Sequence, residues 1–395
     1  MVAPIKRLYF IDAMRAWAIL MMLQGHFIDG LLDPVFRDPE NLAFATWKYF
    51  RGITAPVFFT VSGFIFTYLL LRAPRSGKSN PRIRKGLKRG LQLVLIGYLL
   101  RTNIFGLLTG VIYPSFFLVD VLHCIGVSLM IIIGVYLLTD RLGKRSMATS
   151  LLLTGVVLFL FEPLYKNWEY GWLPDALANY FTKANGSVFT IIPWVGYALL
   201  GGGLATGFHK FRQDRYLYLK SIALCLVAGF LLIWCSSPFF SWVGDFTGVA
   251  LFDQIVLNNY LFIRLGDVFL VFAVFMILRG LMEQRLFLRI GQNTLSIYVI
   301  HFIILYGSFT GFGLYWFFQN SLSPAFVIPG ALLFMMSCTW AALFYDQHEK
   351  HINQKIGELG SFLKDQASIT AEFVLRSAKA QWGRLLNYFS TAKRS

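Results

Sequence analysis

The chain has 395 residues, of which 56% are hydrophobic and 14% charged, and its mean hydropathy is +0.59. This composition excludes a soluble globular protein and predicts a chain built mostly of lipid-embedded helices. The net charge of +16 is explained by loops and a basic tail, so we expect no nucleic-acid partner. The four cysteines lack metal-ligand spacing, so we expect no disulfide framework and no metal site.

Apolar windows of about 20 residues, the length that crosses a bilayer, predict an all-α polytopic integral membrane protein with about ten transmembrane helices. The first window lacks a small-residue cleavage site, and we expect a retained helix rather than a signal peptide. The fifth window is short. The predicted spans are residues 8–31, 49–71, 87–108, 115–138, 146–162, 188–208, 216–236, 257–279, 288–308 and 325–345.

Loop charges predict the orientation of these spans. Residues 72–89 hold eight basic residues and no acidic residue, which is typical of a cytoplasmic loop. Every second loop follows the same pattern, so we expect both termini to be cytoplasmic. Residues 1–345 are predicted to form one transmembrane domain, followed by a basic cytoplasmic tail, 346–395. The tail pattern fits an interfacial amphipathic helix and a solvated helix equally.

The first predicted helix carries ionisable residues in the stretch "IDAMRAWAILMMLQGH". A charge near the bilayer centre costs roughly 2.5–3.5 kcal/mol, so such residues are expected to face the protein interior. Arg15 and His26 are eleven residues apart, which places them on one helical face about 16 Å apart, with Asp12 one turn before Arg15. The pattern predicts a polar track across the membrane. The alternative is a structural Asp12–Arg15 pair and a histidine that only hydrogen-bonds a neighbouring helix.

Other predicted helices place ionisable residues at a similar depth in the outer half of the membrane. Two pairs are spaced three residues apart, which suits ion pairing or hydrogen bonding on one helical face. Each pair could be structural, but together they predict a shared polar cavity. The residues are Arg51, Asp120, His123, Arg264, Asp267 and His301.

Three separated motifs resemble those of the polytopic membrane acyltransferase superfamily. The superfamily includes bacterial acyltransferase-family proteins that modify surface polysaccharides and the heparan-α-glucosaminide N-acetyltransferase group. The opening D-x-x-R with its later histidine, "APVFFTVSGF" and "GQNTLSIYVIH" match its motifs and frame residues 5–310. The segments "VDVLHCIG" and "IIPWVGYALLGGGLA" look more like the N-acetyltransferase branch, whereas the arginine–histidine spacing looks more like the polysaccharide O-acyltransferase branch.

The resemblance implies transfer of an acyl group, expected to be acetyl, from cytoplasmic acyl-CoA to a hydroxyl or amine. The implied acceptor is a glycan or lipid-linked sugar on the outer side of a bacterial inner (plasma) membrane. The expected partners are therefore acyl-CoA, this acceptor and membrane lipid. The resemblance and the polar pattern together give His26, Asp12 and Arg15 as catalytic candidates. The candidates for substrate or cofactor binding are Arg51, Ser62, Asp120, His123, Arg264, Asp267, Asn293, Ser296 and His301.

Two chemical roles suit His26. A neutral imidazole can deprotonate a sugar hydroxyl near neutral pH, or it can carry the acyl group as an acyl-imidazole. Arg15 or Arg51 can stabilise the oxyanion of the thioester, while Arg15 can alternatively meet the phosphates of the donor. A proton-coupled transporter could use the same Asp, Arg and His residues as a relay. A non-catalytic membrane scaffold is the third alternative.

Overall fold

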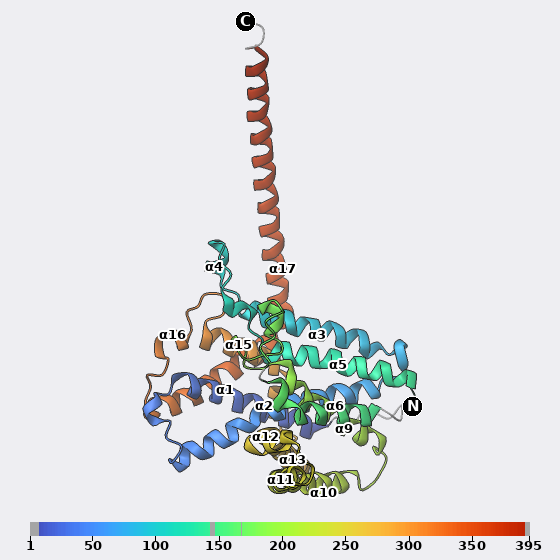
Figure 1. The fold of residues 1–395 in the computed structure, drawn as a ribbon. Helices are drawn as coiled ribbons and strands as arrows, with labels where there is room; N and C mark the ends of the chain where they lie inside the picture. Colours follow the sequence, from blue (N-terminus) through green and yellow to red (C-terminus); the bar gives the residue numbers. More distant parts are fainter. Residues whose placement is uncertain (1–7, 143–146, 167, 392–395) are drawn as a thin grey trace. The chain divides into compact units, whose positions relative to one another are not determined.

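The computed structural model describes residues 8–142, 147–166 and 168–391, and within these ranges the chain forms helices and no β-strand. Figure 1 shows the helices in chain order. Six of them are long and apolar enough to cross a membrane, and a bent pair would make a seventh. The longer helices and the two members of the bent pair, α14 and α15, are α1 (Tyr9–Leu31), α2 (Leu42–Leu71), α3 (Pro81–Leu100), α5 (Val121–Leu142), α6 (Met147–Leu160), α9 (Ile191–Lys210), α10 (Leu217–Phe230), α11 (Ser236–Thr247), α13 (Tyr260–Ile277), α14 (Arg285–Gln292), α15 (Thr294–Tyr306) and α17 (Pro324–Thr391).

This architecture confirms an all-α polytopic membrane protein. Each predicted span coincides with at least one of these helices, but the number ten stays a prediction, because α1 and α3 carry charged residues and α6 has only 14 residues. The short helices between the long ones were not predicted. They are α4 (Ile104–Leu108), α7 (Glu162–Tyr165), α8 (Asp175–Ala178), α12 (Ala250–Leu257) and α16 (Leu314–Phe318).

Two predicted spans were wrong in their extent. The third, 87–108, ends at Leu100, because the next residues leave the helix and pair with a distant loop: the Ile104 amide donates to the Phe309 carbonyl at 2.8 Å. The ninth, 288–308, is two helices, α14 and α15, which are bent by 70° at a short break. Asn293 lies at this break, and its side-chain amide donates to the Arg289 carbonyl at 3.1 Å.

Local capping explains where two of the helices begin. The Asn41 side chain accepts hydrogen bonds from the first amides of α2, at 3.1 Å each. Asn80 caps α3 in the same way, and Pro81 follows at the first helical position, where its missing amide hydrogen costs nothing. These caps satisfy amides that would otherwise lack partners at the helix ends.

Small residues bring the helices that carry the site into close contact. A Cβ on Gly63 of α2 would overlap the backbone of Ala198 in α9, and a Cβ on Gly291 of α14 would overlap the backbone of Asp12 in α1. Such backbone approach is how membrane helices gain packing energy without a hydrophobic driving force between them. Helix α1 packs against α2, α13, α14 and α15, so its polar face is enclosed by protein.

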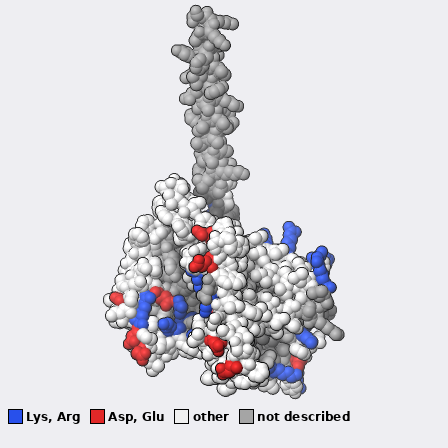
Figure 2. Space-filling model, in the orientation of Figure 1, with Lys and Arg blue, Asp and Glu red and all other residues white. Residues whose placement is uncertain are grey.

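The chain divides into two compact units, Met1–Trp340 and Ala341–Ser395. Helix α17 begins in the first unit and continues through the second. The predicted basic tail falls in the second unit. The interfacial-helix hypothesis depends on apolar and basic side chains of this tail, and these lie outside the described residues. In the first unit, Figure 2 shows Lys and Arg side chains along the edge where α3 begins and α5 ends in Figure 1. A second group, mixed with Asp and Glu, lies on the opposite side.

Candidate active site

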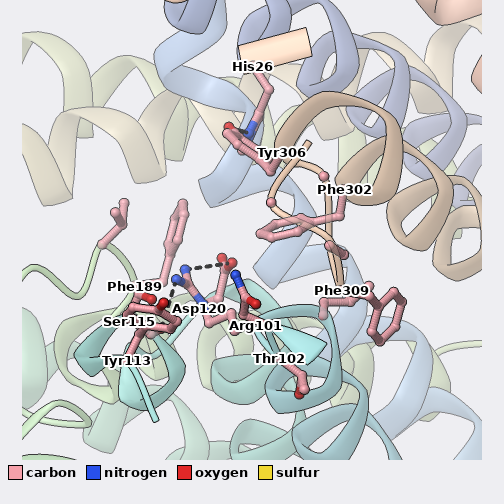
Figure 3. A pocket seen from close by; sticks show the side chains of 16 residues that line it. His26, Arg101, Thr102, Tyr113, Ser115, Asp120, Phe189, Phe302, Tyr306 and Phe309 are labelled. Atoms are coloured by element: carbon pink, nitrogen blue, oxygen red, sulfur yellow. Dashed lines mark hydrogen bonds and ion pairs between the residues drawn. The ribbon is translucent and has the colours of Figure 1, made fainter. Parts of the chain in front are cut away.

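His26 projects from α1 into a cluster of rings contributed by α15. Its Nδ1 lies 2.8 Å from the hydroxyl of Tyr306, at hydrogen-bond distance (Figure 3). Its ring also meets the ring of His301 edge to face, with centroids 5.3 Å apart. His301 is fully buried, and its two nitrogens have no hydrogen-bond partner among the described residues. The two histidines that the sequence singled out on separate helices are therefore neighbours.

Two cavities meet at His26. The larger has a volume of about 460 Å³ and the smaller about 380 Å³, both within the range of small-molecule sites. Four residues line both cavities, so they form the wall between them: His26, Val188, Phe189 and Tyr306. One imidazole can therefore reach ligands in two separate spaces.

The larger cavity contains an ion pair between α3 and the start of α5. Arg101 follows the last residue of α3, and its Nη2 lies 3.1 Å from Oδ2 of Asp120. Both side chains are largely buried, and both face the cavity that His26 lines (Figure 3). Asp120 also accepts the Val121 amide at 2.6 Å, which fixes its carboxylate. Thus Asp120 lies at the cavity, as the shared-cavity hypothesis expects.

The smaller cavity contains a second ion pair, between Arg51 of α2 and Asp29 of α1. The Arg51 side chain packs against Gly25, where a Cβ would approach its Cγ to 3.2 Å. The exposed Lys183 also lines this cavity. The deeper lining is apolar and includes Met21, Met22, Phe58 and Phe59. This cavity therefore combines a cationic rim with an apolar interior.

Asp12 and Arg15 lie at the other end of α1. The Arg15 Nη1 is 3.9 Å from Asp12 Oδ1, and its Nη2 donates to Thr294 Oγ1 at 2.9 Å. The contact with Thr294 ties α1 to the start of α15. Because α1 is continuous, the separation of eleven positions from Arg15 to His26 corresponds to about 16 Å along its axis. Arg15 and His26 thus cannot contact the same small group.

Arg264 and Asp267 form a separate cluster with α2. Their ion pair measures 2.9 Å, and Asp267 also accepts the Tyr49 hydroxyl at 2.6 Å. The Arg264 guanidinium lies over the Tyr49 ring, 4.6 Å from its centroid, and packs against Gly52. Neither ionised side chain lines the two cavities at His26. This cluster joins α13 to α2.

Five more candidates line neither cavity: His123, Ser62, Asn293, Ser296 and His301, of which His301 contacts the site through the His26 ring. His123 is fully buried; its Nδ1 accepts the Asp120 amide at 3.1 Å, and its ring packs on Tyr98 with centroids 4.3 Å apart. The Ser62 hydroxyl donates to the Phe58 carbonyl of its own helix at 2.7 Å. Within the described ranges, no group of three or more His, Cys, Asp or Glu side chains is placed to hold a metal ion.

Tyr306, Arg101 and Asp29 are among the cavity residues that were not predicted from the sequence. Asp29 had a usable signal, since it follows His26 by three residues and so shares its helical face. Arg101 also had a signal, since it is a charged residue inside the predicted span 87–108, where an unpaired charge is costly. Tyr306 carried no distinct signal, because tyrosine is common near the ends of membrane helices.

Comparison with known proteins gives one finding on the family. A family model described as an acyltransferase domain matches residues 8–344. No curated protein matches the chain. The matched range includes every residue that lines the two cavities at His26.

Proposed function

The chain belongs to this acyltransferase family, and we propose that it transfers an acyl group, expected to be acetyl, from cytoplasmic acyl-CoA to a sugar at the outer side of the membrane. The acceptor is a hydroxyl or amine of a glycan or lipid-linked sugar. The multi-pass helical body suits such a reaction, because it can enclose polar groups between two aqueous sides. We place the protein in a bacterial inner membrane.

The position of His26 is the observation that carries this proposal. A transferase needs its base to reach both the acyl carbonyl and the acceptor hydroxyl, and His26 lines two adjoining cavities. Even a partly buried imidazole in a membrane is costly unless it is hydrogen-bonded or used. The smaller cavity has the apolar interior that suits the acyl group, and the larger has the polar groups that suit a sugar.

In the proposed reaction, Nε2 of His26 accepts the proton of the acceptor hydroxyl while its oxygen bonds to the thioester carbonyl carbon. The tetrahedral intermediate then breaks its C–S bond, and the leaving CoA sulfur takes the proton from the imidazolium. Alternatively, Nε2 attacks the thioester carbonyl itself, the C–S bond breaks and CoA leaves as a thiolate. The acceptor hydroxyl then attacks the acyl-imidazole, the bond to Nε2 breaks, and the hydroxyl proton passes to the thiolate. Both routes need the neutral form of His26.

Tyr306 is the proposed positioning residue for this imidazole. If Nε2 is the base, the ring proton must lie on Nδ1, and the Tyr306 hydroxyl oxygen 2.8 Å away is placed to accept it. That hydrogen bond selects the tautomer and the ring orientation, as a carboxylate does in hydrolytic triads. The His301 ring also contacts the His26 ring edge to face, which limits the rotation of the imidazole.

The two arginines of the predicted polar track have different proposed roles. Arg51 lines the same cavity as His26, so its guanidinium can stabilise the oxyanion that develops on the thioester. Arg15, three helical turns away, is too distant for that role. We assign Arg15, with Asp12, to the donor side, where a guanidinium can bind phosphate with two hydrogen bonds.

Reconstituted vesicles distinguish this proposal from the transporter alternative. Acyl-CoA is supplied on one side and a mixture of oligosaccharides on the other, and free CoA and acylated sugar are measured together with solute uptake. We expect CoA release that depends on the sugar, with one acyl group transferred per CoA. Solute uptake or proton flux without loss of the thioester would support the transporter instead.

A further inference from the structure

The larger cavity at His26 combines one buried ion pair with several aromatic rings. Arg101 and Asp120 form the pair, 3.1 Å apart. The rings of Tyr113, Phe189, Phe302 and Phe309 also line this cavity. Aromatic faces are electron-rich and attract positively polarised groups, including the C–H faces of a sugar ring. The lining thus offers both polar and stacking contacts.

Charge separates the two cavities. In the larger one, the negative charge of Asp120 offsets the positive charge of Arg101, and His26 is the one histidine among the described residues of its lining. In the smaller one, Arg51 is paired with Asp29 but Lys183 adds a positive charge. A cavity whose charges cancel offers little electrostatic attraction to an anionic ligand. The ligand would nevertheless lose its hydration on binding, which costs free energy. The larger cavity therefore favours an uncharged polar ligand.

Two polar atoms of this cavity are buried without a hydrogen-bond partner in the described part of the chain. They are Nε of Arg101 and the hydroxyl of Ser308, a residue with only 8% of its surface exposed. A buried donor left unsatisfied costs about 1–3 kcal/mol, so such atoms commonly mark a ligand or water position. Both belong to residues that line the same space as His26.

From these observations, we propose that the larger cavity is the acceptor subsite and that it selects an uncharged sugar ring. The ring stacks on the aromatic faces, and its hydroxyls bond to Arg101, Asp120 and Ser308. One hydroxyl then lies toward His26. This inference rests on the proposed function, because it names the acceptor of the same imidazole. Free and lipid-linked sugars share the chemistry that this cavity recognises.

The full chain in lipid nanodiscs tests the subsite with acetyl-CoA as donor. The acceptors are neutral octyl glycosides (glucoside, galactoside and N-acetylglucosaminide) and octyl glucuronide, an anionic sugar with the same alkyl chain, all below micelle-forming concentrations. We expect kcat/KM to be at least tenfold higher for the best neutral glycoside than for the glucuronide. The corresponding free sugars, without the alkyl chain, show whether a lipid tail is needed.

Asp120→Asn is the decisive variant, because it keeps the size of the side chain but leaves Arg101 unpaired in the cavity. The ratio of kcat/KM for the best neutral glycoside to kcat/KM for the glucuronide should fall by tenfold or more. Asp214→Asn breaks an ion pair with Lys220 outside both cavities and should leave the ratio unchanged. Octyl glucoside should also protect Arg101 in the wild-type protein from modification by phenylglyoxal.

The outcomes distinguish a wrong subsite assignment from a wrong acyltransferase proposal. If acetyl-CoA is consumed but the glucuronide is the better acceptor, or Asp120→Asn does not change the ratio, the subsite assignment is wrong while the acyltransferase proposal stands. If the wild-type protein consumes no acetyl-CoA with any acceptor and Arg101 is not protected, both are wrong.

Discussion

Replacing Tyr306 with phenylalanine tests how His26 is positioned. The variant removes the hydroxyl 2.8 Å from His26 Nδ1 but keeps the ring, which packs on Phe302 with centroids 4.8 Å apart and on Tyr315 at 5.7 Å. The fold should therefore be retained. One lost hydrogen bond is worth about 0.5–1.5 kcal/mol, and 1.4 kcal/mol corresponds to about tenfold in rate. We expect kcat to fall roughly 2- to 13-fold.

The assay follows acyl transfer from acyl-CoA with saturating donor and variable acceptor. A positioning role predicts a lower kcat with little change in the KM of the acceptor, because Tyr306 acts on the imidazole. Tyr315→Phe is the matched control, since Tyr315 contacts the Tyr306 ring and lines neither cavity. An unchanged kcat in Tyr306→Phe would refute the positioning role. A loss as complete as that of His26→Gln would show that the hydroxyl itself takes part in the chemistry.

Three further predictions follow from the same structure. Activity should fall as the pH is lowered through the ionisation of His26, whose ordinary pKa is about 6.5, because only the neutral imidazole accepts a proton; a fall with rising pH would contradict this. Gly63→Ala should destabilise the protein by about 1–3 kcal/mol in a detergent melt, because its Cβ overlaps the α9 backbone, whereas Gly134→Ala meets open space and should not. A cysteine at Ser79 should be protected from an impermeant thiol reagent in intact cells and one at Trp172 should react, and the reverse pattern would invert the topology.

The sequence was sufficient to predict the helical membrane body and the extent of α1, predicted as 8–31 and observed as Tyr9–Leu31. Both follow from short-range rules: an apolar window defines a span, and a residue spacing defines a helical face. The proximity of His26 and His301 was expected from their shared depth, and their rings are in contact. The family resemblance, carried by three motifs, agrees with the family model over residues 8–344.

The remaining features depend on contacts that no local pattern encodes. The bend between α14 and α15 is adjacent to Gly291, which packs on the α1 backbone. Asp120 and Arg264 looked alike in the sequence, since each is an ionisable group three residues from another. Only the fold places Asp120 on the cavity with Arg101, while Arg264 packs against Tyr49. Which helices pack against each other thus decides which of the two ionisable groups lies at the cavity.

The most direct test of the central claim is acyl transfer by purified His26→Gln in vesicles. Glutamine retains one hydrogen-bonding group near Tyr306 but can neither accept the proton nor carry the acyl group. His348→Gln, an exposed position outside both cavities, is the control. We expect the rate of acyl transfer by His26→Gln to fall at least a hundredfold, in the range of general acid–base catalysis. Its melting temperature should not change, and His348→Gln should transfer at the normal rate. Near-normal transfer by a folded His26→Gln protein would contradict the assignment of His26 as the base and the mechanism built on it.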